Sequence, residues 1–360
     1  MFSINNTKKV IHLICAARPN FMKIAPLYHS LKNEDWCDVQ IVHTGQHYDY
    51  QMSQAFFDDL GLPSSHHHLC VGSGSHAEQT AQTMVAYEKL CLEKDKPDLV
   101  VVVGDVNATL ACSIAAKKLH LKIAHLEAGL RSFDRTMPEE INRIVTDSIC
   151  DYHWTPSKDA NENLLREGVK PKQISLVGNI MIDAYCMMKD KIEQKEIYKK
   201  FGLNKQEYVI LTLHRPVNVD SQKCLTEILE KSSAINKQVV FPVHPRTKKN
   251  LEAVKEIPKN LIVIDPLGYI DFISLVSNAA YVISDSGGIQ EETTYLGIPC
   301  FTLRDTTERP VTITMGSNQL VNVNNLLNKI QCPKRGFVPP LWDGKTAERI
   351  KKIIREELYR

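Results

Sequence analysis

The stretch Leu99-Val100-Val101-Val102-Val103-Gly104-Asp105, LVVVVGD in one-letter code, decides the fold class of this chain. Five consecutive apolar residues, four of them β-branched, end at a glycine and an aspartate. Such a run predicts a strand that is buried on both faces, as in a parallel sheet. The following residues 111–119 have the pattern and length of a crossover helix. The segment therefore predicts one strand–helix unit of an α/β protein.

The same pattern recurs along the whole sequence, with helical stretches such as residues 222–233 between the apolar runs. The other predicted strands are residues 10–15, 39–42, 123–126, 174–177, 209–213, 239–243, 261–264, 281–284 and 300–303. This alternation predicts parallel, doubly wound sheets. Because 360 residues are more than a domain with one hydrophobic core usually contains, we expect two such domains, 1–180 and 181–346. The last helix, 347–360, is free to pack back on the first domain.

The composition excludes several classes of protein. With 44 basic and 42 acidic residues the net charge is +2, so no nucleic-acid partner is expected. No apolar run approaches the roughly 18–20 residues of a membrane span, and the polar start lacks a secretory leader. Ten cysteines without C-x-x-C pairs or ligand spacing predict neither disulfides nor a metal site. We therefore predict a cytoplasmic protein, and we interpret His66-His67-His68 as a solvated loop.

Polar and titratable residues gather just after the predicted strands, where α/β proteins bind their ligands. Arg18 and Lys23 follow the first strand, Asp105 follows residues 99–103, and Glu127 follows residues 123–126. His214 comes directly after residues 209–213. Strand interiors stay apolar, so this polarity predicts an active site along one edge of each sheet.

Two features favour a phosphate ligand. Ser286-Gly287-Gly288 opens a predicted helix, where free N–H groups and the helix dipole attract an anion. Arg18, Lys23 and Arg309 add positive charge for the same purpose. The alternative is that the two glycines only form a tight strand-to-helix turn, and the local sequence leaves both readings open.

Three carboxylates, Asp105, Glu127 and Glu139, are candidate acid–base groups. Each also has an ordinary structural explanation, because an aspartate after a strand often caps a turn and Pro138-Glu139 is a common helix start. His214 has the alternative of a packed, hydrogen-bonded histidine. The gathering of all four near strand ends favours the catalytic interpretation.

Taken together, these segments resemble the UDP-N-acetylglucosamine 2-epimerase family, chiefly its non-hydrolysing branch. They occur in family order over nearly the whole chain. The matching segments are Ala17-Arg18-Pro19 with Lys23, Thr44-Gly45-Gln46-His47, Gly104-Asp105, residues 125–131 (HLEAGLR), 138–143 (PEEINR), His214-Arg215, 242–245 (PVHP), 285–292 (DSGGIQEE) and 304–310 (RDTTERP).

The resemblance implies two Rossmann-like domains of the glycosyltransferase-B type with a substrate cleft between them, and a homodimer. It carries catalytic roles onto Asp105, Glu127, Glu139 and His214. Phe272 matches the position that packs on the uracil ring. Substrate-binding roles fall on Arg18, Lys23, Phe272, Ser286, Gly287, Gly288, Glu292 and Arg309.

The implied reaction interconverts UDP-GlcNAc and UDP-ManNAc, precursors for polysaccharide biosynthesis, by eliminating and re-adding UDP through a glycal. This chemistry needs acid–base groups near C2 and stabilisation of the departing diphosphate. It needs no hydride carrier or other cofactor. In agreement, no G-x-G-x-x-G follows the first strand, as a dinucleotide-binding loop would require.

Some positions depart from the common family pattern and leave alternatives open. Asn20 replaces the usual acidic residue, and residues 69–80 lack the basic residue that helps many bacterial members bind an activating UDP-sugar. A modified UDP-hexosamine is therefore an open substrate. The rival functions are a hydrolysing 2-epimerase, a glycosyltransferase of the same fold and a non-catalytic UDP-sugar sensor. The hydrolysing branch typically carries Ser-Arg-Ala where this chain has Ala17-Arg18-Pro19, and this difference favours the non-hydrolysing branch.

Overall fold

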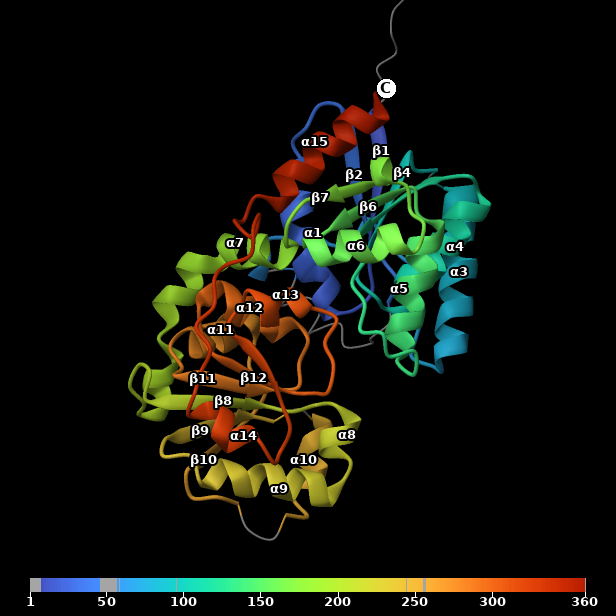
Figure 1. Cartoon of the computed structure of the whole chain (residues 1–360). Helices are drawn as coiled ribbons and strands as arrows, with labels where there is room; N and C mark the ends of the chain where they lie inside the picture. Colours follow the sequence, from blue (N-terminus) through green and yellow to red (C-terminus); the bar gives the residue numbers. More distant parts are fainter. Residues whose placement is uncertain are drawn as a thin grey trace, which may run out of the picture. The chain divides into compact units, whose positions relative to one another are not determined.

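The computed structural model describes residues 8–45, 57, 59–94, 96–243, 245–254 and 257–359, without the side chains of Arg18, Pro245 and Arg246. The chain forms two compact units (Figure 1). Unit 1 comprises Met1–Cys186 with Pro340–Arg360, and unit 2 comprises Met187–Pro339. Helix α7 (Ile180–Lys195) carries the chain from unit 1 into unit 2. The boundaries between the two units, after Cys186 and before Pro340, therefore lie a few residues from the expected limits at 180 and 346.

Unit 1 is built on one parallel sheet with the strand order β3-β2-β1-β4-β5-β6-β7. Its strands are β1 (Lys9–Cys15), β2 (Cys37–His43), β3 (His67–His68), β4 (Leu99–Val103), β5 (Lys122–Leu126), β6 (Tyr152–Thr155) and β7 (Ile174–Leu176). Its further helices are α1 (Arg18–Leu31), α3 (His76–Glu93), α4 (Asn107–Lys118), α5 (Pro138–Ile149), α6 (Lys158–Arg166), the 3-10 turn η1 (Pro171–Gln173) and α15 (Thr346–Leu358).

The strand order of unit 1 reverses between β1 and β4, which is the switch point of a doubly wound sheet. All five residues of β4 are buried, as the unbroken valine run predicts. Val100 and Val102 pack with Ile14 of β1 and Ile123 of β5 in one hydrophobic cluster. The prediction of a parallel sheet covered on both faces is confirmed.

Unit 2 repeats this plan with the strand order β10-β9-β8-β11-β12-β13. Its strands are β8 (Tyr208–Thr212), β9 (Gln238–Pro242), β10 (Leu261–Ile264), β11 (Tyr281–Ser284), β12 (Cys300–Leu303) and β13 (Asn318–Val321). Its helices are η2 (Ile197–Phe201), α8 (Pro216–Val219), α9 (Gln222–Ser233), α10 (Pro245–Leu251), α11 (Tyr269–Ser277), α12 (Gly288–Leu296), α13 (Pro310–Thr314) and α14 (Leu326–Ile330). Here the switch point lies between β8 and β11.

The C-terminal helix α15 packs on α1 within unit 1 (Figure 1). The Tyr359 hydroxyl donates a hydrogen bond of 2.9 Å to the carbonyl of Trp36, and Lys351 pairs with Glu34 at 3.2 Å. The segment before this helix is also held, because Trp342 Nε1 donates to the carbonyl of Pro156 at 2.9 Å. The end of the chain is thus part of the first unit.

Of the interpretation of His66-His67-His68 as a solvated loop, the loop was wrong, whereas His66 and His68 are indeed exposed to solvent. His67 and His68 form the edge strand β3, which pairs in parallel with β2. His66 Nδ1 accepts a hydrogen bond of 3.1 Å from the amide of Ile41, and burial lowers the pKa of this imidazole. The backbone groups at the edge of β2 need partners, and the histidine segment supplies them.

None of the described helices is long and apolar enough to span a bilayer.

Candidate active site

The turn after β5 presents a buried carboxylate, Glu127, which is 4% exposed. Its φ of 72° lies in the left-handed region, an unusual conformation for a residue with a side chain. Glu127 Oε2 forms an ion pair of 2.5 Å with Lys23 Nζ from α1. Glu127 Oε1 is also buried and has no hydrogen-bond partner among the described residues. The lysine thus occupies one oxygen of the carboxylate and leaves the other in position to accept a proton.

The turn after β4 approaches this ion pair closely. Gly104 has a φ of 65°, and a Cβ atom at this position would lie 3.0 Å from Lys23 Nζ and 3.6 Å from Glu127 Oε2. Only glycine combines this backbone conformation with so little space. The two turns at the carboxyl ends of β4 and β5 therefore meet beside the switch point of unit 1.

Asp105, next in the chain, is held by helix α5. Its Oδ2 pairs with Arg143 Nη2 at 2.5 Å, and Arg143 Nη1 pairs with Glu140 at 2.6 Å. Asn142 Nδ2 donates to the carbonyl of Asp105 at 2.8 Å. The Arg143 side chain is almost fully buried, whereas that of Asp105 is 29% exposed. The arginine thus fixes a carboxylate that still reaches solvent.

Glu139 lies in the first turn of α5, directly before Glu140, and is half-buried. Unit 1 therefore brings Lys23, Asp105 and Glu127 together through the β4 and β5 turns. It places Glu139 on the helix that anchors Asp105, but no hydrogen bond or ion pair joins Glu139 to the other three among the described residues.

In unit 2, the predicted catalytic histidine is held by a buried aspartate. His214 Nδ1 lies 3.0 Å from Asp285 Oδ1, and the backbone amides of His214 and Arg215 also donate to this carboxylate. Asn218 Nδ2 adds a further hydrogen bond of 3.0 Å. Burial opposes ionisation of Asp285, but the contacts with His214 and Asn218 outweigh it and lower the pKa. An ionised Asp285 keeps the proton on Nδ1 and so fixes the tautomer of the ring.

The predicted phosphate-binding turn follows β11. Ser286 and Gly287 lead into α12, and Gly288 is its first residue. All three are partly exposed. A Cβ atom at Gly287 would lie 2.6 Å from Glu308 Oε1 and 3.0 Å from Arg309 Nη1, so a larger residue there would displace the ends of these side chains. The helix N-terminus and the arginine together favour an anion near this turn.

Arg309 forms ion pairs with two carboxylates. Its Nε lies 3.0 Å from Glu291 Oε1, and its Nη1 pairs with Glu308. Glu308 pairs in addition with Arg304 at 2.8 Å. All four side chains are buried, so they form an alternating charge network beneath the N-terminus of α12.

Glu292 on α12 is buried, and its surroundings raise its pKa. Burial, with the nearby charge of Glu291, raises its pKa to about 8, although Tyr269 and Arg309 act in the opposite direction. Glu292 is therefore a neutral hydrogen-bond donor at neutral pH. Phe272 lies on the neighbouring helix α11 and is partly exposed.

Some of the predicted positions are not among the residues or side chains that the structure describes. The side chain of Arg18 is not described, although the residue begins α1. Gln46, His47 and His244 of the matching segments lie outside the described residues.

A family model described as UDP-N-acetylglucosamine 2-epimerase matches residues 29–355. The chain belongs to the UDP-N-acetylglucosamine 2-epimerase family. The epimerase of this name from Methanocaldococcus jannaschii is 42% identical over 97% of this chain and 100% of its own length. A crystal structure of the M. jannaschii UDP-GlcNAc 2-epimerase in complex with UDP-GlcNAc and UDP has a TM-score of 0.88 at 41% identity. The match covers 96% of this chain and 99% of the M. jannaschii chain.

Two further relatives bear on substrate and fold. The UDP-2,3-diacetamido-2,3-dideoxy-D-glucuronate 2-epimerase of Pseudomonas aeruginosa is 40% identical over 86% of this chain and 87% of its own length. A lipopolysaccharide outer core galactosyltransferase shares the fold, with a TM-score of 0.56 at 14% identity over 97% of this chain and 99% of its own. The predictions of an isomerase and of two Rossmann-like units of the glycosyltransferase-B type are confirmed.

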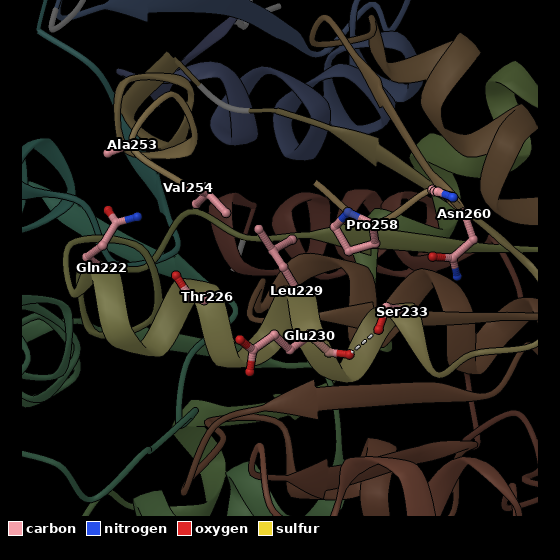
Figure 2. Close-up of a pocket in the computed structure, with 10 residues that line it drawn as sticks. Gln222, Thr226, Leu229, Glu230, Ser233, Ala253, Val254, Pro258 and Asn260 are labelled. Atoms are coloured by element: carbon pink, nitrogen blue, oxygen red, sulfur yellow. Dashed lines mark hydrogen bonds between the residues drawn. The ribbon is translucent and has the colours of Figure 1, made fainter. Parts of the chain in front are cut away.

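The cavity in Figure 2 lies elsewhere on the epimerase. It has a volume of about 820 Å³ and lies between helix α9 and the residues Ala253, Val254, Pro258, Lys259 and Asn260. Among the described residues, Glu230 and Lys259 are the only charged ones that line it, and none of the predicted site residues does. The strand ends with their paired carboxylates are therefore the better candidate site.

Sequence reasoning missed the residues that hold the site. Arg143 and Asp285 lie in matching segments and Asn218 does not, and no local pattern links any of them to Asp105 or His214. The available signal was indirect, since each lies in a segment that follows a strand or opens a helix. Their partners are 38 or about 70 residues away in the chain, and only the sheet brings them together.

Proposed function

We propose that this epimerase interconverts UDP-GlcNAc and UDP-ManNAc without net hydrolysis, by eliminating and re-adding UDP. The observation that carries the proposal is the Lys23–Glu127 pair. The buried carboxylate of Glu127 has one oxygen 2.5 Å from the Lys23 ammonium group, and its other oxygen has no hydrogen-bond partner among the described residues. Such an oxygen suits proton transfer to and from carbon in a water-poor site.

Elimination comes first. As the C1–O bond to UDP breaks, its electron pair leaves with the diphosphate and positive charge develops at C1. This charge acidifies the C2–H bond, and a carboxylate of unit 1 takes the proton. The C–H electron pair becomes the C1=C2 double bond of the glycal. Asp105, Glu127 and Glu139 are the residues proposed for proton transfer at C2.

Unit 2 holds the nucleotide and stabilises the leaving group. Ser286, Gly287 and Gly288 supply the N-terminus of α12, and Arg309 supplies positive charge close to it. His214, oriented by Asp285, assists at the diphosphate. The remaining proposed substrate contacts are those of Arg18, Lys23, Phe272 and Glu292.

Inversion is completed when the glycal is protonated on its opposite face and UDP adds back to C1. Two acid–base groups on different faces of C2 are needed, and unit 1 carries carboxylates on separate elements. Asp105 follows β4 and is anchored by Arg143, whereas Glu127 follows β5 and is anchored by Lys23. The two carboxylates are thus held independently of each other, as transfer of a proton on two different faces requires.

A hydrolysing 2-epimerase, which releases UDP and a free ManNAc-type sugar, would use the same first step and then admit water. A glycosyltransferase would use the phosphate-binding turn but has no task for the carboxylates of unit 1. Both are therefore weaker candidates. We also propose a homodimer as the assembly, on the basis of the family resemblance.

The test is an NMR time course of the purified protein with UDP-GlcNAc in deuterated water. The proposal predicts a mixture of the two UDP-sugars in which both carry deuterium at C2. Free ManNAc and UDP would instead establish the hydrolysing reaction. A retained C2 proton in both sugars would refute the elimination mechanism.

A modified sugar is a second candidate substrate, because the relative that acts on a diacetamido glucuronate is nearly as similar as the one named for UDP-GlcNAc. The same time course with UDP-2,3-diacetamido-2,3-dideoxy-D-glucuronate separates the two. Turnover of that sugar alone would reassign the substrate and leave the chemistry at C2 unchanged.

A further inference from the structure

Beneath the two catalytic turns of unit 1 lies a buried ionic cluster to which the proposed function assigns no role. It consists of His125 on β5, Asp147 on α5, and Arg131 with Glu167 behind them. The side chains of His125, Asp147 and Arg131 are at most 1% exposed. None of them belongs to the candidate site.

Asp147 clamps the Glu127 turn on both sides. Its Oδ1 lies 2.6 Å from His125 Nδ1, two residues before Glu127. Its Oδ2 accepts a hydrogen bond of 3.0 Å from the amide of Gly129, two residues after Glu127. A glutamate with a φ of 72° resides between these contacts. Such a conformation persists only where the surroundings fix it.

His125 connects this clamp to the neighbouring turn. Its Nε2 lies 2.8 Å from the carbonyl oxygen of Gly104, which precedes Asp105. One imidazole thus contacts both the β4 turn and the carboxylate that holds the β5 turn. The carbonyl and the carboxylate are both hydrogen-bond acceptors, and the two ring nitrogens face one of them each.

The cluster keeps Asp147 ionised. Burial opposes ionisation of Asp147, but the charges and hydrogen bonds of His125 and Arg131 outweigh it and lower its pKa to about 2. Arg131 lies 2.7 Å from Asp147 and pairs on its other side with Glu167 at 2.6 Å. The carboxylate that contacts both turns is therefore itself fixed by a second charged group.

We propose that His125 and Asp147 are positioning residues for the epimerase reaction. Their buried ion pair fixes the turn that carries Asp105 relative to the turn that carries Glu127. The inference rests on the proposed function, since it gives those two carboxylates their roles at C2. A displacement of about 1 Å at such groups lowers turnover by on the order of 100-fold.

The principal variant is Asp147→Asn. Its side-chain NH2 group would lie opposite an N–H donor that now forms a hydrogen bond with a carboxylate oxygen of Asp147. The matched control is Asp151→Asn. Asp151 follows the same helix and accepts a hydrogen bond of 3.0 Å from the amide of Ile123, near the opposite end of β5. Both substitutions remove one charge that pairs with strand β5, but only Asp147 holds the catalytic turns.

For Asp147→Asn we expect a loss in kcat of roughly 100-fold, while KM and the calorimetric Kd for UDP stay within about threefold of the parent, because unit 2 binds the nucleotide. Exchange of the C2 proton in deuterated water should slow by the same factor as kcat. Asp151→Asn should retain kcat within about threefold. Loss of UDP binding in step with kcat, or an unchanged kcat, would overturn the proposal.

Two conservative variants keep the test informative if Asp147→Asn does not fold. In His125→Asn the amide nitrogen replaces Nδ1 and keeps the bond to Asp147, whereas in His125→Gln it replaces Nε2 and keeps the bond to Gly104. Each folded variant should lose at least about tenfold in kcat at unchanged UDP affinity. Parent-like kcat in both would overturn the positioning role.

Glu127→Gln separates this inference from the proposed function. An inactive Glu127→Gln beside a fully active Asp147→Asn refutes only the positioning role. An active Glu127→Gln refutes the proposed chemistry itself, and with it the inference.

Discussion

The most direct physical consequence of the structure concerns Glu292, whose pKa is raised to about 8 by burial. A glutamate in the unfolded chain titrates near 4.5. Between these values the folded protein keeps a proton that the unfolded chain has released. Stability contributed by this group is therefore fully present below pH 4.5 and is lost as the pH rises to about 8.

The size of the effect follows from the shift. Each pKa unit corresponds to about 1.4 kcal/mol, so the difference from 4.5 to about 8 is on the order of 5 kcal/mol. At pH 7, roughly 3 kcal/mol of it is lost. The substitution Glu292→Gln replaces the acid with a neutral group of the same shape. It should flatten the dependence of unit 2 stability on pH by about one proton, and should stabilise unit 2 at pH 8.

The assay must report on unit 2 alone. All three tryptophans, Trp36, Trp154 and Trp342, lie in unit 1, so their fluorescence is an internal control that should not change. Amide hydrogen exchange of peptides from α12, followed from pH 5 to 8 and corrected for intrinsic rates, gives the opening free energy of unit 2. Glu230→Gln, at an exposed glutamate of α9, is the control substitution. Parallel profiles for Glu292→Gln and the parent protein would show that Glu292 is ionised when folded and refute the reasoning.

Three further predictions follow from single contacts. Arg143→Lys cannot hold Asp105 and its second carboxylate partner with a planar fork, so kcat should fall by about 10–100-fold at unchanged UDP affinity in steady-state assays. Asp285→Asn replaces one of the two oxygens that accept from His214 and two backbone amides with an NH2 donor, and should destabilise unit 2 by about 2–3 kcal/mol in urea unfolding and weaken UDP binding. Gly178→Ala places a Cβ 2.1 Å from a backbone oxygen at a φ of 95° and should lower the thermal midpoint of unit 1.

Each of these outcomes has a clear contrary result. Full activity of Arg143→Lys would mean that Asp105 does not need an arginine that bridges it to Glu140. Parent-like UDP binding by Asp285→Asn would separate His214 from the nucleotide. An unchanged midpoint for Gly178→Ala, with Gly168→Ala as a control at a glycine that has no neighbour within 4 Å, would show that the C-terminal segment moves aside without cost.

The sequence by itself determined the class of fold and the places where chemistry is found. A run such as Leu99–Val103 is apolar on every residue because both faces of a parallel strand are covered by helices, and this pattern is local. The glycines and carboxylates after the strands are equally visible, because a strand must end in a turn. The motif segments, in family order, then indicated a UDP-sugar epimerase, and the family match agrees.

Only the tertiary structure decided which of these residues act together. The sequence suggested Lys23 as a phosphate ligand, whereas the structure pairs it with Glu127, 104 residues away. It likewise gave Glu292 a neutral carboxyl, Asp285 an ionised one, and His67-His68 a place at the edge of a sheet. Ion pairing and burial depend on distances between elements that are remote in the chain. Periodicity and turn chemistry carry no information about those distances, so the partners of the site residues had to come from the fold.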